Sequence, residues 1–182
     1  ARGYLQRASG SWRHGQGFLS PHVYQARVGP LLDVDAFFHQ NNAAYLIHCE
    51  LARWELSAAS GLLTYAWRQK AAFIVGATSI SYKRELNPFQ RFEVHSQVVA
   101  FDDRWMTICH EFRSPGKGDM FAIAMCRAVM RHRHGFCNPA HVISDLGINV
   151  DSKPPCHPVV MDASILAAQL DATLRKLTRN TA

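Results

Sequence analysis

One long helical segment followed by several long β-rich segments is the pattern that most constrains what this chain can fold into. From Asn42 to about Ser60, apolar residues recur every three to five positions, which predicts one helix of about five turns, roughly 27 Å long. Asn41 or Asn42 is a suitable N-cap for this helix, and Gly61 supplies its stop signal. β-rich runs then follow at 72–82, 92–101, 105–112 and 121–133.

The order of these segments predicts an α+β domain. Residues 23–28 alternate in character and form a first strand ahead of the helix, and the last three β-rich runs, joined by short turn signals, form a meander of hairpins. One helix cannot cover both faces of so large an antiparallel sheet. We therefore expect about five strands wrapped around one long central helix, with an edge or face left for a partner subunit. This predicts at least a homodimer, with a tetramer left open.

The length of the chain bounds its domain organisation. With 182 residues, of which 48% are hydrophobic, the chain has room for one domain with a substantial core. We expect a polar, basic N-terminal segment at 1–20, the globular domain at 21–136 and a C-terminal extension at 137–182. The extension is expected to contain a short helix from about Asp162 to Leu177.

The net charge of +6 and the pI near 9.3 favour an anionic partner. A phosphate-bearing cofactor, a nucleic acid and an acidic membrane surface all fit this charge, and charge alone does not choose among them. The basic residues are scattered, with local groups such as Arg127, Arg131 and Arg133. Because no single-strand-binding aromatic motif or recognition helix accompanies them, nucleic acid is not an expected partner.

The cysteines and the first 20 residues indicate the cellular compartment in which the protein is expected. The five cysteines are widely spaced, odd in number and free of any C-x-x-C pair, which indicates free thiols in a reducing compartment. No apolar run approaches the ~18 residues of a membrane span. Residues 1–20 are rich in Arg, Ser and Gly without an acidic residue, as at the edge of a targeting sequence or anchor. We expect an intracellular protein, cytoplasmic or mitochondrial, with membrane contact only through a segment outside this sequence.

Potential chemistry is concentrated immediately before the long helix. Asp33, Asp35, His39, Asn41 and Asn42 place two carboxylates, an imidazole and two amides within ten positions. A helix start offers unpaired N–H groups and the positive end of the macrodipole, so it polarises a carbonyl placed there, and a nearby carboxylate can act as base or nucleophile. The structural alternative is an Asx turn or a helix cap, which is a common role for Asp at such a position.

The string Asp33-x-Asp35-x-x-x-His39-x-Asn41-Asn42-x-x-Tyr45 resembles the signature of the 4-hydroxybenzoyl-CoA thioesterase-like family of acyl-CoA and acyl-carrier-protein thioesterases, which have the hotdog fold. The likeness covers about residues 22–136. The runs at 101–105 and 112–114 further resemble a eukaryotic branch of the thioesterase superfamily whose animal members carry an N-terminal hydrophobic anchor.

The resemblance implies hydrolysis of acyl-CoA thioesters. Asp35 would be the base or nucleophile, backbone N–H groups from His39 to Asn42 would bind the oxyanion, and Asn42 would cap the helix or steer the carbonyl. His39 would protonate the leaving thiolate or orient other groups. No metal is implied, and no cofactor beyond coenzyme A as part of the substrate. Phe37 stands where plant acyl-carrier-protein thioesterases have Asn, which leaves open a weak or inactive acyl-CoA- or lipid-binding scaffold.

Five further residues are candidates for substrate contact or for an alternative nucleophile. Lys83 and Arg84 are candidates to bind coenzyme A phosphates, with a solvated surface as the alternative, and Tyr45 is a candidate to line an acyl tunnel, with the core as the alternative. Ser79 lies on the strand expected opposite the helix start, where it would touch the acyl carbonyl or the attacking water; the alternative is packing or solvent exposure. Glu50 is the alternative nucleophile, because a second group of hotdog thioesterases draws its carboxylate from the central helix. A serine hydrolase is not supported, since the chain has no G-x-S-x-G.

Overall fold

The computed structural model describes residues 15–116 and 118–149 and has an α+β architecture. Its elements are β1 (His22–Arg27), α2 (Asn42–Ser60), α3 (Leu62–Arg68), β2 (Ala72–Tyr82), β3 (Arg91–Phe101), β4 (Trp105–Arg113), β5 (Met120–His132), β6 (Gly135–Phe136) and α4 (Pro139–Asp145). The predicted central helix and the five long strands are confirmed, each within a residue or two of the expected limits.

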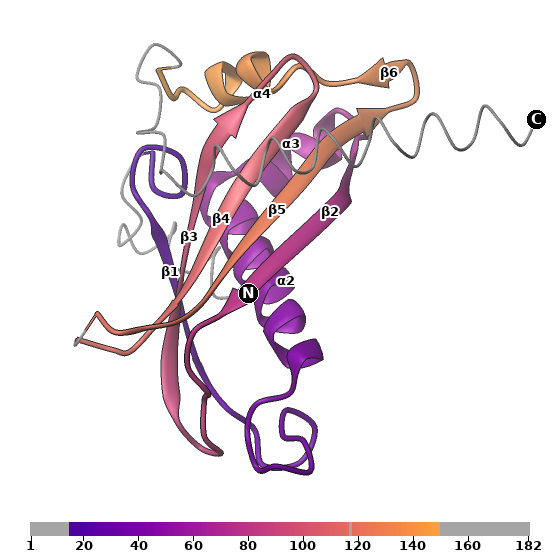
Figure 1. Ribbon diagram of the computed structural model, residues 1–182. Helices are drawn as coiled ribbons and strands as arrows, with labels where there is room; N and C mark the ends of the chain where they lie inside the picture. The colour runs from indigo at the N-terminus through magenta and orange to yellow at the C-terminus, as the bar shows by residue number, and fades with distance from the viewer. Residues whose placement is uncertain (1–14, 117, 150–182) are drawn as a thin grey trace, which may run out of the picture.

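The strands form one antiparallel sheet in the order β1-β3-β4-β5-β2, with the two-residue β6 paired to the end of β5. The meander predicted for the last three long strands is confirmed as β3-β4-β5. β2 precedes this meander in the sequence but pairs with its last strand, so β1 and β2 are the outer strands of the sheet. Figure 1 shows the sheet curving around α2, with β1 and β2 at opposite sides.

The main core lies between α2 and the concave face of the sheet. One side of α2 contributes Tyr45, Cys49 and Ala52, all at most 2% exposed, and the sheet contributes Phe92 and Phe112. Apolar residues at the opposite side of α2 are 44–56% exposed, namely Leu46, Ile47, Leu51 and Trp54. The helix is therefore apolar on both sides, but only one side is covered within this chain.

Three short elements, α3, β6 and α4, were not predicted. Gly61 ends α2 with φ of 86° and also begins α3, so the residue that indicates a stop is a joint between two helices. Val142 and Ile143 of α4, followed by Ile148, are buried, which attaches residues 137–149 to the sheet. The helix expected at 162–177 lies outside the described residues. No helix in the described ranges is long and apolar enough to cross a membrane.

Candidate active site

A small closed loop connects β1 to α2 and carries the two aspartates. Val34 and Gln40 form an antiparallel bridge, and the Asp35 N–H donates to the His39 carbonyl at 2.9 Å. The Asp33 carboxylate accepts the Gly29 N–H at 2.7 Å, and the backbone carbonyl of Asp33 accepts the Asn41 N–H at 2.7 Å. Asp33 therefore closes the base of the loop, a structural role of the kind that the Asx-turn alternative describes.

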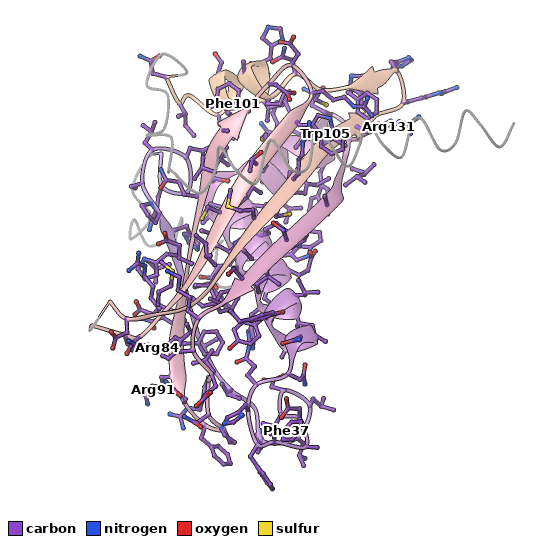
Figure 2. The ribbon with its side chains drawn as sticks, viewed as in Figure 1. Phe37, Arg84, Arg91, Phe101, Trp105 and Arg131 are labelled. Carbon is purple, nitrogen blue, oxygen red and sulfur yellow. The ribbon has the colours of Figure 1, made fainter. Side chains whose placement is uncertain are left out.

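Asp35 lies at the exposed end of this loop. Its Oδ1 accepts the backbone N–H groups of Phe37 at 2.8 Å and His39 at 3.3 Å. Its Oδ2 forms no hydrogen bond within the described part of the chain, so one carboxylate oxygen is held and the other is open to a substrate or water. Phe37 and Phe38 are 80% and 75% exposed beside it, and Figure 2 shows Phe37 at the end of the molecule. The loop thus presents a carboxylate next to an uncovered apolar surface.

The start of α2 is capped by Asn41. The Asn41 Oδ1 accepts the Ala44 N–H at 2.8 Å, and its Nδ2 donates to the Leu32 carbonyl at 2.9 Å. Asn42 is the exposed first residue of the helix, so the alternative in which Asn42 is the cap is wrong. The N–H groups of His39, Gln40 and Asn41 already have partners. This leaves the N–H groups of Asn42 and Ala43, at the positive end of the helix dipole, as the donors available to an oxyanion.

His39 and Tyr45 lie near this helix start in different environments. The half-buried His39 imidazole has no hydrogen-bond partner among residues 15–116 and 118–149, so a role as acid or orienting group stays a prediction. Tyr45 is 2% exposed and packs with Tyr82 and Phe112, at ring-centroid distances of 5.1 and 5.0 Å. Burial raises the pKa of Tyr45 to about 12. The structure thus places Tyr45 in the core beneath the loop and not on an open tunnel wall.

Ser79 faces away from the helix, which argues against contact with an acyl carbonyl at the helix start of the same chain. Successive side chains of a strand alternate between the two faces of a sheet. Ile80 packs against the core beneath α2, and Tyr82 contacts Tyr45. Ser79, one residue out of phase with both, is therefore on the opposite face. Ser79 is exposed there, as the alternative of packing or solvent exposure predicts.

Lys83 and Arg84 follow β2 at the same end of the sheet as the Asp35 loop. The backbone N–H groups of Lys83 and Arg84 both donate to the Phe121 carbonyl. The Gln40 N–H donates to the Leu86 carbonyl at 2.8 Å, which links the Asp35 loop to the segment that follows β2. Arg84 lies 3.5 Å from Asp119, in an exposed pair. Figure 2 shows Arg84 toward the end of the molecule that carries Phe37. Two cationic side chains, Lys83 and Arg84, therefore lie at the end of the sheet that carries the Asp35 loop.

A buried polar network that the sequence did not indicate connects the middle of α2 to the sheet. Arg53, 8% exposed, pairs with Glu50 and lies 3.4 Å from the His110 Nε2, while the Ser96 Oγ lies 2.8 Å from the His110 Nδ1. Since Arg only donates, His110 accepts at Nε2 and carries its proton on Nδ1, which donates to Ser96. Burial, assisted by the Arg53 charge, lowers the pKa of His110 to about 3.

A cavity of about 260 Å³ lies beside this network, between the second half of α2, α3 and the start of β2. Its walls are mainly apolar and include Trp54, Leu63, Trp67, Phe73 and Met130. Glu50 and Arg53 lie on its polar side. The cavity is at the opposite end of α2 from Asp35 of the same chain, so a single chain does not bring the carboxylate and the cavity together.

The family of the chain follows from its sequence as a whole. The sequence model of the thioesterase-like superfamily matches residues 30–164, about three quarters of the chain. The chain belongs to the thioesterase-like superfamily. The match begins just before the Asp35 loop and runs past residue 136. Among the described residues of this superfamily domain, no group of three His, Cys, Asp or Glu side chains is arranged to hold a metal ion.

Relatives within the superfamily include Protein THEM6 of Danio rerio, 36% identical over 109 residues, which are 60% of this chain and 54% of the relative. Thioesterase poxG of Penicillium oxalicum is 25% identical over 124 residues, covering 60% of this chain and 41% of the relative. The chain thus spans about half the length of the curated relatives it matches.

Solved structures support the hotdog fold of this domain. YbaW, a probable thioesterase of Escherichia coli, superposes with a TM-score of 0.62 at 21% identity, covering 68% of this chain and 95% of YbaW. The Staphylococcus aureus protein SAV2348, solved in complex with CoA, gives a TM-score of 0.64 at 13% identity, covering 76% of this chain and 88% of SAV2348. At these identities the likeness establishes the fold alone.

Proposed function

We propose that the protein hydrolyses acyl-CoA thioesters, with Asp35 as the catalytic carboxylate. The observation that carries this proposal is the exposed Asp35, with Oδ2 unoccupied, on a loop that leads directly into the open N-terminus of α2. Membership of the thioesterase-like superfamily supports the same chemistry. The N–H groups of Asn42 and Ala43 would stabilise the negative charge that develops on the thioester oxygen.

Two routes use the same groups. As a nucleophile, the Asp35 carboxylate would bond to the thioester carbonyl carbon as the C–S bond breaks, and water would then hydrolyse the resulting anhydride. As a base, the Asp35 carboxylate would remove a proton from water. The water oxygen would then bond to the thioester carbonyl carbon as the C–S bond breaks. Both routes end in the free acid and the CoA thiol. His39 would donate the proton to the departing thiolate, and Lys83 and Arg84 would bind the phosphates.

The complete site would require a homodimer. β2 is an edge strand, and Ile74, Val75 and Tyr82 on it are 38–42% exposed, next to the uncovered apolar side of α2. An isologous, antiparallel pairing of two β2 strands would bury this surface. β2 begins at the cavity, where Phe73 lines the wall, and ends beside the Asp35 loop, where Tyr82 contacts Tyr45. Antiparallel pairing would therefore place the cavity of one protomer beside the catalytic loop of its partner.

The test is hydrolysis of short, long and aromatic acyl-CoAs, followed by release of free thiol. We expect Asp35→Asn to lower kcat by about 10²–10⁴-fold, the usual contribution of a positioned general base. The matched control is Asp103→Asn, which removes another exposed carboxylate at 101–105 and is expected to leave kcat unchanged. Equal activity of wild type and Asp35→Asn would remove Asp35 from the chemistry and direct attention to Glu50.

The alternative is an acyl-CoA-binding scaffold with little or no turnover. One observation favours it: the Phe37 N–H holds Asp35 Oδ1, and the Phe37 side chain offers no polar group to the site. Calorimetric titration with free CoA and with a non-hydrolysable acyl-CoA analogue separates the two functions. Analogue binding by wild type and Asp35→Asn, without turnover of any thioester by either protein, would establish the scaffold.

A further inference from the structure

A group of arginines interleaved with aromatic rings lies at the end of the sheet remote from Asp35. We call it the basic-aromatic cluster, and its members are Arg104, Trp105, Arg127, Arg131 and Phe136. The Arg104 guanidinium lies 3.6 Å from the Phe136 ring centroid and 5.4 Å from that of Trp105. Arg127 lies 4.5 Å over Trp105, and Arg131 lies 5.6 Å from Phe136. Figure 2 shows Trp105 and Arg131 together, at the opposite end of the molecule from Phe37 and Arg91.

The fold holds this cluster in place. Arg131 and Phe136 are cross-strand partners of β5 and β6, and Trp105 begins β4. An added Cβ at Gly76 of β2 would come within 2.6 Å of the Trp105 ring, so this ring lies close against the neighbouring strand. The Asp102 Oδ1 accepts the N–H groups of Arg104 and Trp105 and fixes the turn. The side chains are therefore ordered by the sheet before any partner arrives.

Much of the positive charge in the cluster is not neutralised within the described part of the chain. Arg127 lies 3.8 Å from Asp102. In contrast, the side chains of Arg104, Arg131 and the neighbouring Arg133 form no hydrogen bond or ion pair among the described residues, and the Arg104 Nε is buried without a partner. A guanidinium stacked on an aromatic face still presents its edge for bidentate binding, which suits phosphate and carboxylate oxygens.

We propose that the basic-aromatic cluster binds the surface of a membrane that contains acidic phospholipids. The turn between β5 and β6 carries Arg133 and His134, both exposed, and Phe136 is 40% exposed beside them. Acidic head groups match the arginines, and the interfacial layer of a bilayer also accepts an exposed aromatic ring next to cations. This contact goes beyond the thioesterase site, and it departs from the expectation that a membrane is met only through a segment outside this sequence.

The same contacts argue against nucleic acid as the partner. Guanidinium groups already lie over the Trp105 and Phe136 rings, so these rings are not open platforms for stacking bases of a single strand. A duplex backbone would satisfy the arginines but would leave Phe136 in water. A lipid interface is the partner that accommodates both the charge and the exposed ring.

The experiment is co-sedimentation of the 182-residue chain with phosphatidylcholine vesicles that either contain or lack phosphatidylserine. We expect binding only to the acidic vesicles, weakened by added salt because the interaction is between exposed charges. The variant Arg131→Glu/Arg133→Glu should bind at least about tenfold more weakly, since each basic residue contributes separately to surface attraction. Phe136→Ser should weaken binding without changing its salt dependence.

The matched control is Arg27→Glu/Arg91→Glu, which changes the net charge equally at an exposed cross-strand pair near the other end of the sheet. The control should bind like wild type, and all variants should keep the wild-type circular dichroism spectrum. If the two charge-reversal variants weaken vesicle binding equally, the overall charge alone attracts the protein to the membrane. That result would overturn the proposal. Unchanged binding of Arg131→Glu/Arg133→Glu would also overturn it, as would preferential binding to duplex oligonucleotides in competition with the acidic vesicles.

Discussion

His110 is fully buried on β4, and its two ring nitrogens are occupied from different sides. Arg53 reaches it from α2 and Ser96 from β3, so one neutral imidazole joins three elements. These residues are far apart in the sequence and none belongs to a recognisable motif, which is why sequence analysis did not group them. In contrast, the residues of the Asp35 loop are contiguous, and their spacing alone indicated a site. A site formed by contiguous residues can be predicted from the sequence, whereas a network of residues that only the folded sheet brings together cannot.

Acid is expected to destabilise the protein through His110. Burial and the Arg53 charge lower its pKa to about 3 from an ordinary 6.5. Between these two pH values the unfolded chain binds a proton at His110 that the folded chain does not bind. The free energy of unfolding should therefore be unaffected by this group above pH 6.5 and fall as pH decreases below it, by up to about 1.4 kcal/mol per pH unit.

Urea denaturation of wild type and His110→Gln across this pH range measures the effect. Gln keeps an acceptor for Arg53 and a donor for Ser96 but does not titrate. His48, whose pKa burial also lowers, remains in both proteins, so the difference in their pH dependence isolates His110. Parallel curves for the two proteins would contradict the assignment.

At the scale of elements, the long segments were predictable and the short ones were not. The limits of α2 follow from its periodicity, its cap and Gly61, and the five long strands follow from β-rich runs separated by turn signals. α3 and α4 have seven residues each, too few for a periodic pattern to stand out. For α4 the start signal was present, because Asn138 caps the helix and Pro139 occupies its first turn. For α3, Gly61 correctly predicted the end of α2, but it gave no indication that a second helix follows directly.

The N-cap of α2 ties the helix to the loop that carries Asp35. Asn41→Ala removes the hydrogen bond to the Ala44 N–H and also the bond to the Leu32 carbonyl. We expect the free energy of unfolding to fall by about 1 kcal/mol, within the usual 0.5–2 kcal/mol for a lost cap. The control, Asn42→Ala, changes the adjacent exposed amide and should stay within about 0.5 kcal/mol of wild type. Urea unfolding curves decide, and equal losses from the two variants would contradict the assignment of Asn41 as the cap.

At the scale of the whole molecule, the two parts of the proposed site are separated along α2. The Asp35 loop precedes its first turn, whereas the cavity begins at Glu50 and extends past its end. Glu50 is eight residues after the helix start at Asn42, roughly 12 Å along the axis at 1.5 Å per residue, so one thioester carbonyl cannot lie at both places. Apolar side chains exposed on α2 and the free edge of β2 run between the two places. A second protomer, turned by a twofold axis, would cover that surface and join the loop to the cavity.

This arrangement predicts that two inactive variants restore each other. Asp35→Asn removes the carboxylate and leaves the cavity, while Ala72→Trp fills the cavity from an exposed position and leaves the carboxylate. In a mixed dimer, the intact Asp35 of one chain faces the open cavity of the other, so one of its two sites is complete. Random re-association of equal amounts gives mixed dimers in half of the population, and about a quarter of wild-type activity is expected. Co-refolding of the two variants, followed by the thiol-release assay, measures the recovery. If each site lies within one chain, the mixture stays as inactive as its components, because neither chain by itself contains both an intact carboxylate and an open cavity.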